Sequence, residues 1–385
     1  MSDLRGRILA ALLSTFAVVA AAGAVATVPT GPAAAQIVLP GPWLTVSAGG
    51  THTCAIKQNH TLWCWGANNL GQLGLGTLTV PQYQPVQVGS QADWASVSAG
   101  DTHTCALKTN GARYCWGDNS YGQLGLPGGH RSAPGGLRGE GAWHRLDAGY
   151  HHTCGVKADG RPYCWGRNHF GQLGVGDNLN RSLPAQVSGN LWHSVSAGGN
   201  FSCGIRGDQV RFCWGANSSG QLGLGDHIAR NTPIRRLNEA AGWDAVIAGE
   251  HHTCGYVGLL LYCWGSNQFG QLGLGDNNGR NLPTLNGIAF SEVTPGGLHT
   301  CRLSSGSRTC TGWNHDGQLG LGDHIERNLF TGVAVDPAWR TLSAGKQHTC
   351  GVTTLNYLYC WGSNELGKLG IGLATPTRNV PTLVV

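Results

Sequence analysis

The sequence predicts an all-β protein, a seven-bladed β-propeller with four-stranded blades. The first observation is that its fourteen cysteines fall as seven similarly spaced pairs. The second is that these pairs recur every 47 to 51 residues as parts of a longer repeat. The third is a composition of 62 glycines and only 12% charged residues, which is typical of many short strands joined by turns. Self-similarity at this period indicates a solenoid or a propeller.

The repeat leads us to expect one domain over residues 36–385 rather than several independent ones. Its unit has the form W-x-x-V-S-A-G-x-x-H-T-C-A-L-K-x-x-G-x-x-Y-C-W-G-x-N-x-x-G-Q-L-G. The seven units begin near Trp43, Trp94, Trp143, Trp192, Trp243, Phe290 and Trp339.

Each unit contains segments whose β-branched and aromatic residues predict strands. In the second unit these segments are residues 94–99, 103–108 and 113–117, bounded by turn-forming residues. A fourth, looser strand is predicted around residues 85–88, with counterparts at 184–187 and 381–384. Four strands in each of seven units describe the propeller.

The hairpin turn at Asn110-Gly111 predicts the disulfide pairing. Asn-Gly supplies the positive φ values of a tight turn, and counting outward from it places Cys105 opposite Cys115. Directly opposed residues of antiparallel strands are close enough for a disulfide. We therefore expect one disulfide in every blade: Cys54 with Cys64, Cys105 with Cys115, Cys154 with Cys164, Cys203 with Cys213, Cys254 with Cys263, Cys301 with Cys310, and Cys350 with Cys360.

The C-terminal segment is expected to close the ring. Residues 380–385 have a strand pattern and no following unit. We expect them to pair into the blade that begins at Trp43, with residues 36–39 as the competing segment for that place.

The N-terminal 35 residues have the character of an export signal. Arg5 and Arg7 precede an apolar stretch over residues 8–28, and Ala33-Ala34-Ala35 forms a small-residue cleavage site. We expect a cleaved signal peptide over residues 1–35, with an uncleaved membrane anchor as the alternative. Seven disulfides also require an oxidising compartment, so we expect a secreted, cell-surface or periplasmic protein.

Two repeated side-chain patterns have a chemical and a structural interpretation. A histidine stands two residues before the first cysteine in six units, where the pair could bind zinc or the histidine could make a structural hydrogen bond. Asp177/Arg181 and its three counterparts could serve catalysis or pin a loop. Because an active site is needed once rather than repeatedly, we favour the structural interpretation of both and expect neither metal nor cofactor.

The recurring sequence W-G-x-N-x-x-G-Q-L-G, preceded by A-G-x-x-H-T, resembles the repeats of the regulator of chromosome condensation family. This resemblance covers all seven units and implies a seven-bladed propeller. The family includes a nuclear exchange factor for a small GTPase, a plant ultraviolet receptor and a secreted bacterial inhibitor of β-lactamases. The leader and the cysteines argue against the nuclear role, and Thr51 or His151 stands where the receptor has tryptophan. The exported bacterial inhibitor is the most similar in compartment and architecture.

Residues that vary between units gather on one face of the predicted disc. Exposed aromatic and histidine side chains are favoured anchors of interfaces. We therefore predict a binding face formed by Tyr121, Tyr150, His151, His169, Phe170, Glu250, His251, Phe269 and Lys346, with packing between neighbouring blades as the alternative for some of the aromatic residues.

The resulting functional prediction is an exported, non-catalytic binding protein. We expect a monomer whose partner is an extracellular or periplasmic protein, with a surface glycan as the other class of partner. It would meet a membrane only through an uncleaved N-terminal segment. The scattered net charge of +5 provides no basic stripe for nucleic acid. One alternative is a guanine-nucleotide exchange factor, which predicts free thiols; the other is a polysaccharide-acting enzyme, which predicts an acid pair or an acid/base pair within one blade.

Overall fold

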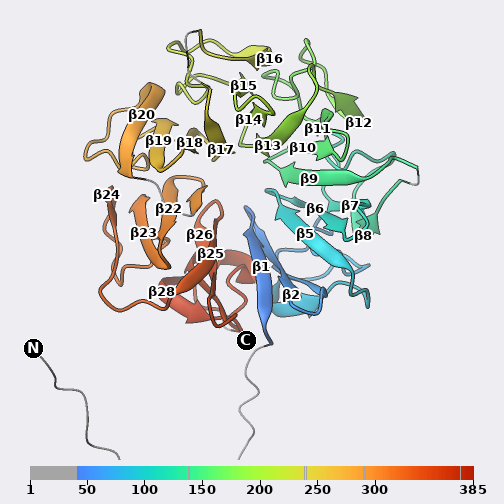
Figure 1. Ribbon diagram of the computed structural model, residues 1–385. Coiled ribbons are helices and arrows are strands. Elements are labelled where there is room, and N and C mark those ends of the chain that lie inside the picture. The colour runs from blue at the N-terminus through green and yellow to red at the C-terminus, as the bar shows by residue number, and fades with distance from the viewer. Residues whose placement is uncertain (1–40, 138, 238, 240, 289–291, 373) are drawn as a thin grey trace, which may run out of the picture. The chain divides into compact units, whose positions relative to one another are not determined.

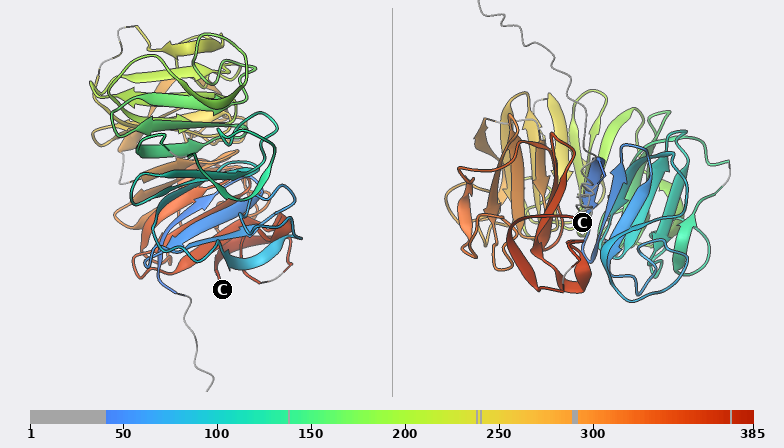
Figure 2. Two further views of the ribbon diagram at one scale, coloured as in Figure 1. Left: turned by 90° about the vertical axis from the view of Figure 1, so that its right-hand side faces the viewer. Right: turned by 90° about the horizontal axis from the view of Figure 1, so that it is seen from below.

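The computed structural model describes residues 41–385, except 138, 238, 240, 289–291 and 373. This part of the chain forms seven four-stranded antiparallel sheets around a common axis (Figure 1). Seen from the side, the sheets stand as blades of one disc (Figure 2). The predicted seven-bladed propeller is therefore confirmed.

Every blade uses its strands in chain order, from the channel to the rim. The innermost strands are β1 (Trp43–Ala48), β5 (Trp94–Ala99), β9 (Trp143–Ala148), β13 (Trp192–Ala197), β17 (Trp243–Ala248), β21 (Glu292–Pro295) and β25 (Trp339–Ala344). The second strands are β2 (His52–Lys57), β6 (His103–Lys108), β10 (His152–Lys157), β14 (Phe201–Arg206), β18 (His252–Val257), β22 (His299–Ser304) and β26 (His348–Thr353).

The two outer positions of each blade complete the sheets. The third strands are β3 (Leu62–Gly66), β7 (Arg113–Gly117), β11 (Pro162–Gly166), β15 (Arg211–Gly215), β19 (Leu260–Gly265), β23 (Ser307–Gly312) and β27 (Leu358–Ser363). The outermost strands are β4 (Gln82–Gln87), β8 (Arg131–Gly135), β12 (Arg181–Gln186), β16 (Arg230–Ile234), β20 (Arg280–Ile288), β24 (Arg327–Thr331) and β28 (Thr377–Leu383). A short 3-10 helix, η1 (Glu365–Gly367), lies between β27 and β28.

The outermost strands begin earlier than the sequence predicts. β4 starts at residue 82 instead of 85, because Gln82 already pairs with Gly66 before the ladder passes an irregularity between Gly66 and Cys64. A β-bulge of this kind adds residues that a count of alternating side chains does not reveal.

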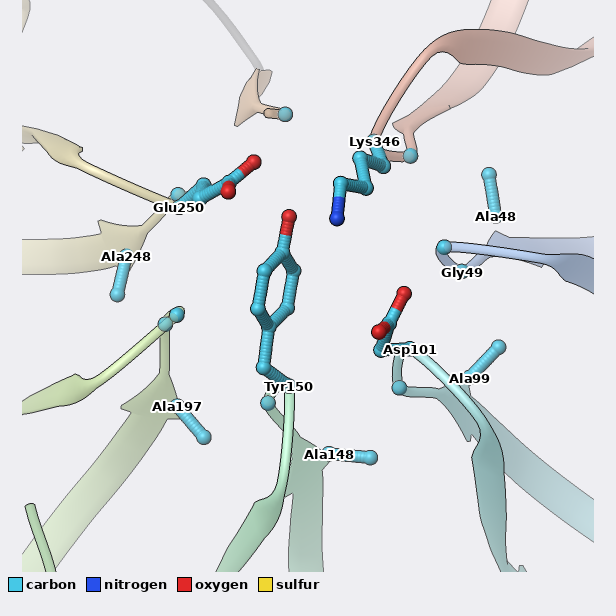
Figure 3. Close-up of a pocket in the computed structure, with 18 of the residues that line it drawn as sticks. Ala48, Gly49, Ala99, Asp101, Ala148, Tyr150, Ala197, Ala248, Glu250 and Lys346 are labelled. Atoms are coloured by element: carbon cyan, nitrogen blue, oxygen red, sulfur yellow. The ribbon is translucent and has the colours of Figure 1, made fainter. Parts of the chain in front are cut away.

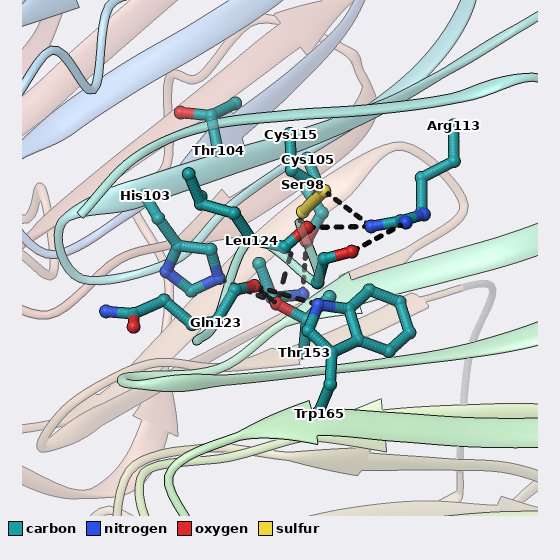
Figure 4. The surroundings of a disulfide bond; sticks show 12 residues. Ser98, His103, Thr104, Cys105, Arg113, Cys115, Gln123, Leu124, Thr153 and Trp165 are labelled. Carbon is teal, nitrogen blue, oxygen red and sulfur yellow. Dashed lines mark hydrogen bonds between the residues drawn. A yellow bond between two sulfur atoms is a disulfide. The ribbon is translucent and has the colours of Figure 1, made fainter. Parts of the chain in front are cut away.

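All seven predicted disulfides form between directly opposed residues of the second and third strands. Cys105 is the register partner of Cys115, and their Cα atoms lie 4.1 Å apart (Figure 4). The described residues contain no free cysteine, so the count from the Asn110-Gly111 turn gave the correct register. The other six bridges, with Cα atoms 4.1 to 4.2 Å apart, join Cys54 to Cys64, Cys154 to Cys164, Cys203 to Cys213, Cys254 to Cys263, Cys301 to Cys310, and Cys350 to Cys360.

Two of these bridges close a hairpin that is one residue shorter than the rest. The two cysteines are 9 residues apart in the bridge of Cys254 and Cys263 and in that of Cys301 and Cys310, but 10 residues apart in the bridge of Cys350 and Cys360. The shortening falls in the turn, because the cysteines remain direct register partners in both arrangements. The disulfide register is therefore independent of the turn length.

A recurring set of hydrogen bonds forms the joint between one blade and the next. At the joint of blades two and three, the backbone carbonyl of Gln123 accepts bonds from Thr153 Oγ1 at 2.8 Å and from Trp165 Nε1 at 2.9 Å (Figure 4). His103 Nε2 lies 2.8 Å from the same threonine oxygen. On the innermost strands, the Ala148 backbone N–H donates to Ser98 Oγ at 2.9 Å. Each joint thus has four recurring bonds in its complete form.

The joint geometry determines the protonation state of the buried histidines. The Thr153 hydroxyl has one proton, which it donates to the Gln123 carbonyl, so it must accept its bond from His103 Nε2–H. The buried Nδ1 has no hydrogen-bond partner, so burial favours the neutral ring with its proton on Nε2. Complete burial lowers the pKa of His103 to about 3, and the pKa values of His52, His152, His252 and His299 to about the same value.

The repeated aspartate and arginine residues form local ion pairs beside the outermost strands. Arg181 donates to Asp177 at 2.5 Å and to the Leu179 carbonyl at 2.8 Å, so the pair holds the loop that leads into β12. The counterparts Asp226/Arg230, Asp276/Arg280 and Asp323/Arg327 are paired at 2.6 to 2.7 Å.

The joint of blades five and six departs from the common pattern. Thr311 occupies the buried position that tryptophan has in the other blades, and Phe330 of β24 packs against Gly273 where the equivalent Gly223 meets the Trp264 ring. Pro295 has no backbone N–H to donate, and Ile247 has no hydroxyl to accept it. Two of the four recurring bonds are therefore chemically impossible at this joint.

The predicted closure of the ring by the C-terminal strand is wrong. β28 pairs with β27 of its own blade, because blade seven has no other segment to serve as its outermost strand. Blades one and seven instead meet through the usual joint, in which Trp65 Nε1 donates to the Lys368 carbonyl at 3.0 Å and His348 Nε2 lies 2.8 Å from Thr53 Oγ1. Each blade is therefore one continuous stretch of chain.

Several sequence predictions fall outside the described residues. These are the leader over residues 1–35, the competing segment 36–39 and the unit start at Phe290. Within the described part of the chain, no helix is long and apolar enough to cross a membrane.

Candidate functional site

The mouth of the central channel is the candidate site, and one repeat position builds it. Each innermost strand ends in a small residue followed by glycine, and the residue after that glycine begins the turn to the second strand. These turns surround a cavity of about 170 Å³ (Figure 3). The decisive position is occupied, in blade order, by Gly50, Asp101, Tyr150, Gly199, Glu250, Gly297 and Lys346.

Tyr150 extends from the turn between β9 and β10 into the middle of this cavity (Figure 3). Its hydroxyl oxygen is buried beside the Glu250 carboxylate and makes no hydrogen bond of good geometry among the described residues. Burial raises the pKa of Tyr150, and the negative charges of Glu250 and Asp101 raise it further, so the phenol stays protonated at physiological pH. The cavity therefore contains a hydrogen-bonding group that a bound partner could satisfy.

Charged groups from two other blades surround the Tyr150 ring. Lys346 Nζ lies 4.6 Å from the ring centre, a cation–π distance. The Glu250 carboxylate lies on the other side of the hydroxyl, and its Oε1 is 3.3 Å from His251 Nε2 (Figure 3). Burial alone would raise the pKa of Glu250, but contacts with His251 and Tyr150 and the charge of Lys346 lower it overall. The carboxylate is therefore charged at neutral pH.

Asp101 and Asp147 also line the cavity, and the sequence prediction missed both. Asp147 accepts bonds from Ser98 and Ser196 at 3.1 and 2.9 Å, yet burial raises its pKa. Both aspartates can be recognised from their positions in the sequence repeat. Asp147 stands where most units have serine or threonine, and Asp101 occupies the repeat position of Tyr150 and Glu250.

An aromatic cluster joins the channel mouth to the outer part of the face. The Tyr121 ring centre lies 5.5 Å from His151 and 6.0 Å from His169, and His151 lies 6.2 Å from Tyr150. The Arg167 guanidinium lies 5.2 Å from the Tyr121 ring. Four of the predicted binding residues are thus in one continuous contact.

The other predicted residues are arranged in two ways. Glu250, His251 and Lys346 belong to the channel mouth, as described above. Phe170 is 43% exposed in the loop between β11 and β12, away from the lining of the cavity. Phe269 lies near Trp313 of the next blade, with ring centres 6.0 Å apart, and Trp313 is a residue that the sequence prediction passed over.

The described residues contain no group of three or more histidine, cysteine, aspartate or glutamate side chains placed to hold a metal ion. The six buried histidines instead lie within hydrogen-bond distance of a hydroxyl in the next blade.

Comparison with known proteins identifies the repeat. One model of the regulator of chromosome condensation (RCC1) repeat matches residues 59–107, 159–205, 212–256 and 260–303. A second model of the same repeat matches residues 44–72, 94–123, 143–172 and 339–368, and together they match more than half of the chain. The chain belongs to the RCC1-repeat family. RCC1-like propellers are binding scaffolds.

Individual relatives of this RCC1-repeat chain match over shorter stretches. It is 40% identical over 83 residues to the probable E3 ubiquitin-protein ligase HERC4 of Homo sapiens, and 37% identical over 83 residues to the ultraviolet-B receptor UVR8 of Arabidopsis thaliana. Each match covers 21% of this chain, but only 8% and 19% of those relatives. Prp20p of Saccharomyces cerevisiae has the same fold, with a TM-score of 0.77 and 22% identity over 89% of this chain and 87% of its own.

Proposed function

We propose that this RCC1-repeat protein is an exported, non-catalytic propeller that binds another protein through the face around its channel mouth. One observation carries the proposal: Tyr150, Glu250 and Lys346 reach from three blades into a cavity otherwise lined mainly by glycine, alanine and serine. Small residues at these turns would leave the cavity open and featureless. Three unlike large side chains at one repeat position give the cavity a specific set of contact groups.

The chemistry of this face suits a protein partner. The buried Tyr150 hydroxyl, the Glu250 carboxylate and the Lys346 ammonium group offer both donors and acceptors at the centre. Tyr121, His151 and His169 add aromatic surface beside it. Interfaces between proteins combine an anchored aromatic centre with a polar surround.

Export is supported by the disulfides and by the leader-like sequence. Seven disulfides persist only where the surroundings are oxidising, which the cytosol and the nucleus are not. The proposal therefore groups this chain with exported bacterial members of its family, and not with a nuclear exchange factor.

Affinity capture with paired variants tests the binding face. The purified protein is incubated with secreted and cell-surface fractions, and the captured proteins are compared with those of the double variant Tyr150→Ala/Lys346→Ala. We expect the double variant to lose a partner that the wild type retains. The matched control is Lys157→Ala, a lysine at the end of β10 and remote from the cavity lining. Equal capture by wild type and double variant contradicts the proposal.

Thiol labelling tests the compartment. Cells are lysed in the presence of an alkylating reagent, and the protein is analysed by mass spectrometry. We expect none of the fourteen cysteines to be modified before reduction. Alkylation of most of them in the native protein would contradict export.

A further inference from the structure

An aromatic platform on blades five and six arises from the irregular sixth unit. Where the other units read C-W-G, this unit reads Cys310-Thr311-Gly312-Trp313, so its tryptophan stands two residues later. The later position is Ala67, Asp118, Arg167, Ala216, Ser266 or Ser363 in the other units. A large aromatic residue at this position is therefore particular to the sixth unit.

The core of the sixth blade is complete without this tryptophan. Thr311 is fully buried, and its Oγ1 lies 2.9 Å from the Gly270 carbonyl and 2.7 Å from the Arg327 carbonyl. Phe330 supplies the ring that packs against Gly273. Trp313 consequently does not occupy the buried joint position of the other tryptophans and lies instead in the loop that follows β23.

Three rings form the platform. Trp313 stacks on His315 with ring centres 6.0 Å apart and planes inclined by 19°, and its ring centre also lies 6.0 Å from that of Phe269. Trp313 and Phe269 are half-buried and His315 is exposed. Of the fourteen tryptophans, only Trp313 and Trp63 are not buried. Partly exposed aromatic rings in mutual contact are favoured anchors of binding sites.

A polar groove of about 430 Å³ continues from Phe269 along the start of β24. Its lining includes Asn277, Glu326, Arg327, Asn328 and Leu329. The amides of Asn277 and Asn328 donate to the Gln268 and Gly275 carbonyls, which leaves their Oδ1 atoms as acceptors. Arg327 is paired with Asp323 at 2.6 Å. The groove therefore presents the two Oδ1 acceptors and the Glu326 carboxylate, together with the second N–H of each amide as a donor.

We infer that the platform and groove bind a neutral carbohydrate chain. A pyranose ring has an apolar face of C–H groups that fits an aromatic side chain, and hydroxyl groups at its edge that donate to carboxylate and amide oxygens. The Glu326 carboxylate disfavours an acidic sugar by charge repulsion. This site is separate from the channel mouth, and the inference does not depend on the protein partner proposed above.

Tryptophan fluorescence and calorimetry test the inference. The variant Trp63→Phe removes the other indole that is not buried. A change in tryptophan fluorescence on adding ligand then reports mainly on Trp313. Soluble oligomers of glucose, mannose and N-acetylglucosamine are titrated into the full chain. We expect at least one oligomer to shift the emission and to release or absorb heat, and Trp313→Ala or Phe269→Ala to weaken its binding by about tenfold or more.

The matched control is Phe170→Ala, because Phe170 occupies the loop position of Phe269 in blade three but has no tryptophan beside it. We expect its sugar affinity and its melting temperature to equal those of the wild type. The inference is overturned if no oligomer gives a calorimetric signal, if both platform variants bind as tightly as the wild type, or if only peptides bind. Loss of protein capture by the channel variants with intact sugar binding would separate the two sites.

Discussion

At the scale of single residues, one threonine hydroxyl links three groups at most joints between blades. Thr153 donates to the Gln123 carbonyl and accepts from His103, so its removal leaves two buried polar groups without this partner. Blade four has Phe201 in place of the histidine, and Thr253 in the next blade donates only to the Gln221 carbonyl. These two joints form a matched pair.

We expect Thr153→Val to lower the free energy of unfolding by about 1 to 3 kcal/mol more than Thr253→Val. Both variants lose one hydrogen bond to a carbonyl that also accepts from tryptophan. Only Thr153→Val also leaves a buried histidine N–H without its acceptor. Denaturant unfolding at neutral pH measures the difference. An equal loss of unfolding free energy in the two variants would show that the histidine hydrogen bond makes no net contribution to stability.

The buried histidines predict sensitivity to acid. Histidine in the unfolded chain titrates near pH 6.5, whereas the pKa of His103 in the folded protein is about 3. Between these values the unfolded chain binds more protons, so the stability of the fold is lost as pH falls below 6.5. Each such histidine contributes up to about 1.4 kcal/mol per pH unit. Above pH 6.5, the contribution of these histidines to the free energy of unfolding should be nearly constant.

His103→Phe, which copies the arrangement of blade four, isolates the effect of one histidine. We expect the variant to lose about 1.4 kcal/mol less than the wild type when the pH is lowered from about 7.5 to about 5.5. Denaturant unfolding at both pH values measures the loss. A packing difference at neutral pH does not affect this comparison, because each protein is compared with itself. An unchanged pH dependence would contradict the low pKa.

At the scale of elements, each blade is held by a disulfide across its central hairpin. The two strands already pair in register, so the bridge acts mainly on the unfolded chain by closing a short loop. The hairpin is also the part of the structure that the sequence predicts best. The bounds of β5, β6 and β7 agree with the predicted ranges, because repeated cysteines and an Asn-Gly turn fix them locally.

We expect the double substitution Cys105→Ala/Cys115→Ala to lower the free energy of unfolding by about 2 to 3 kcal/mol. Denaturant unfolding without reductant measures the change. In strong reductant the wild type also loses this bridge, so the two proteins should then unfold at similar denaturant concentrations. A difference that persists after full reduction would assign the effect to packing instead of the cross-link.

Features that join separate blades were harder to predict. The pattern showed that Tyr150, Glu250 and Lys346 share a face, but not that Tyr150 fills the channel, since this depends on how the seven blades pack. The scrambled sixth unit was visible, whereas its repair by Phe330 rests on a contact with Gly273 of another blade. The predicted pairing of β28 was wrong because a strand pattern fits either neighbouring edge.

At the scale of the whole molecule, the ring contains seven uninterrupted blades and no exchanged strand among the described residues. The two ends of the described chain lie close together, and Val384 and Trp43 belong to one apolar cluster. The order of blades along the chain should therefore matter little for the folded structure.

A circular permutant tests this conclusion. A short linker joins Val385 to Gly41, and the chain is opened at Gly189, between blades three and four. We expect a melting temperature close to that of the unpermuted residues 41–385. The matched control opens the chain at Asp208, inside the hairpin that carries Cys203 and Cys213, and should be less stable. Equal destabilisation by both openings would show that blades are not the units of this fold.

The incomplete joint between blades five and six has a mechanical consequence. Pro295, Ile247 and Thr311 remove two of the usual four bonds there, and the contact of Thr311 with the Gly270 carbonyl and a β-bridge between Leu274 and Leu329 replace them in part. We expect opening under heat or force to begin at this joint, because a backbone N–H and an indole N–H no longer donate across it. Phe269 belongs to blade five and Trp313 to blade six, so the aromatic platform spans this joint. A molecule bound across both rings would therefore also stabilise the closed ring.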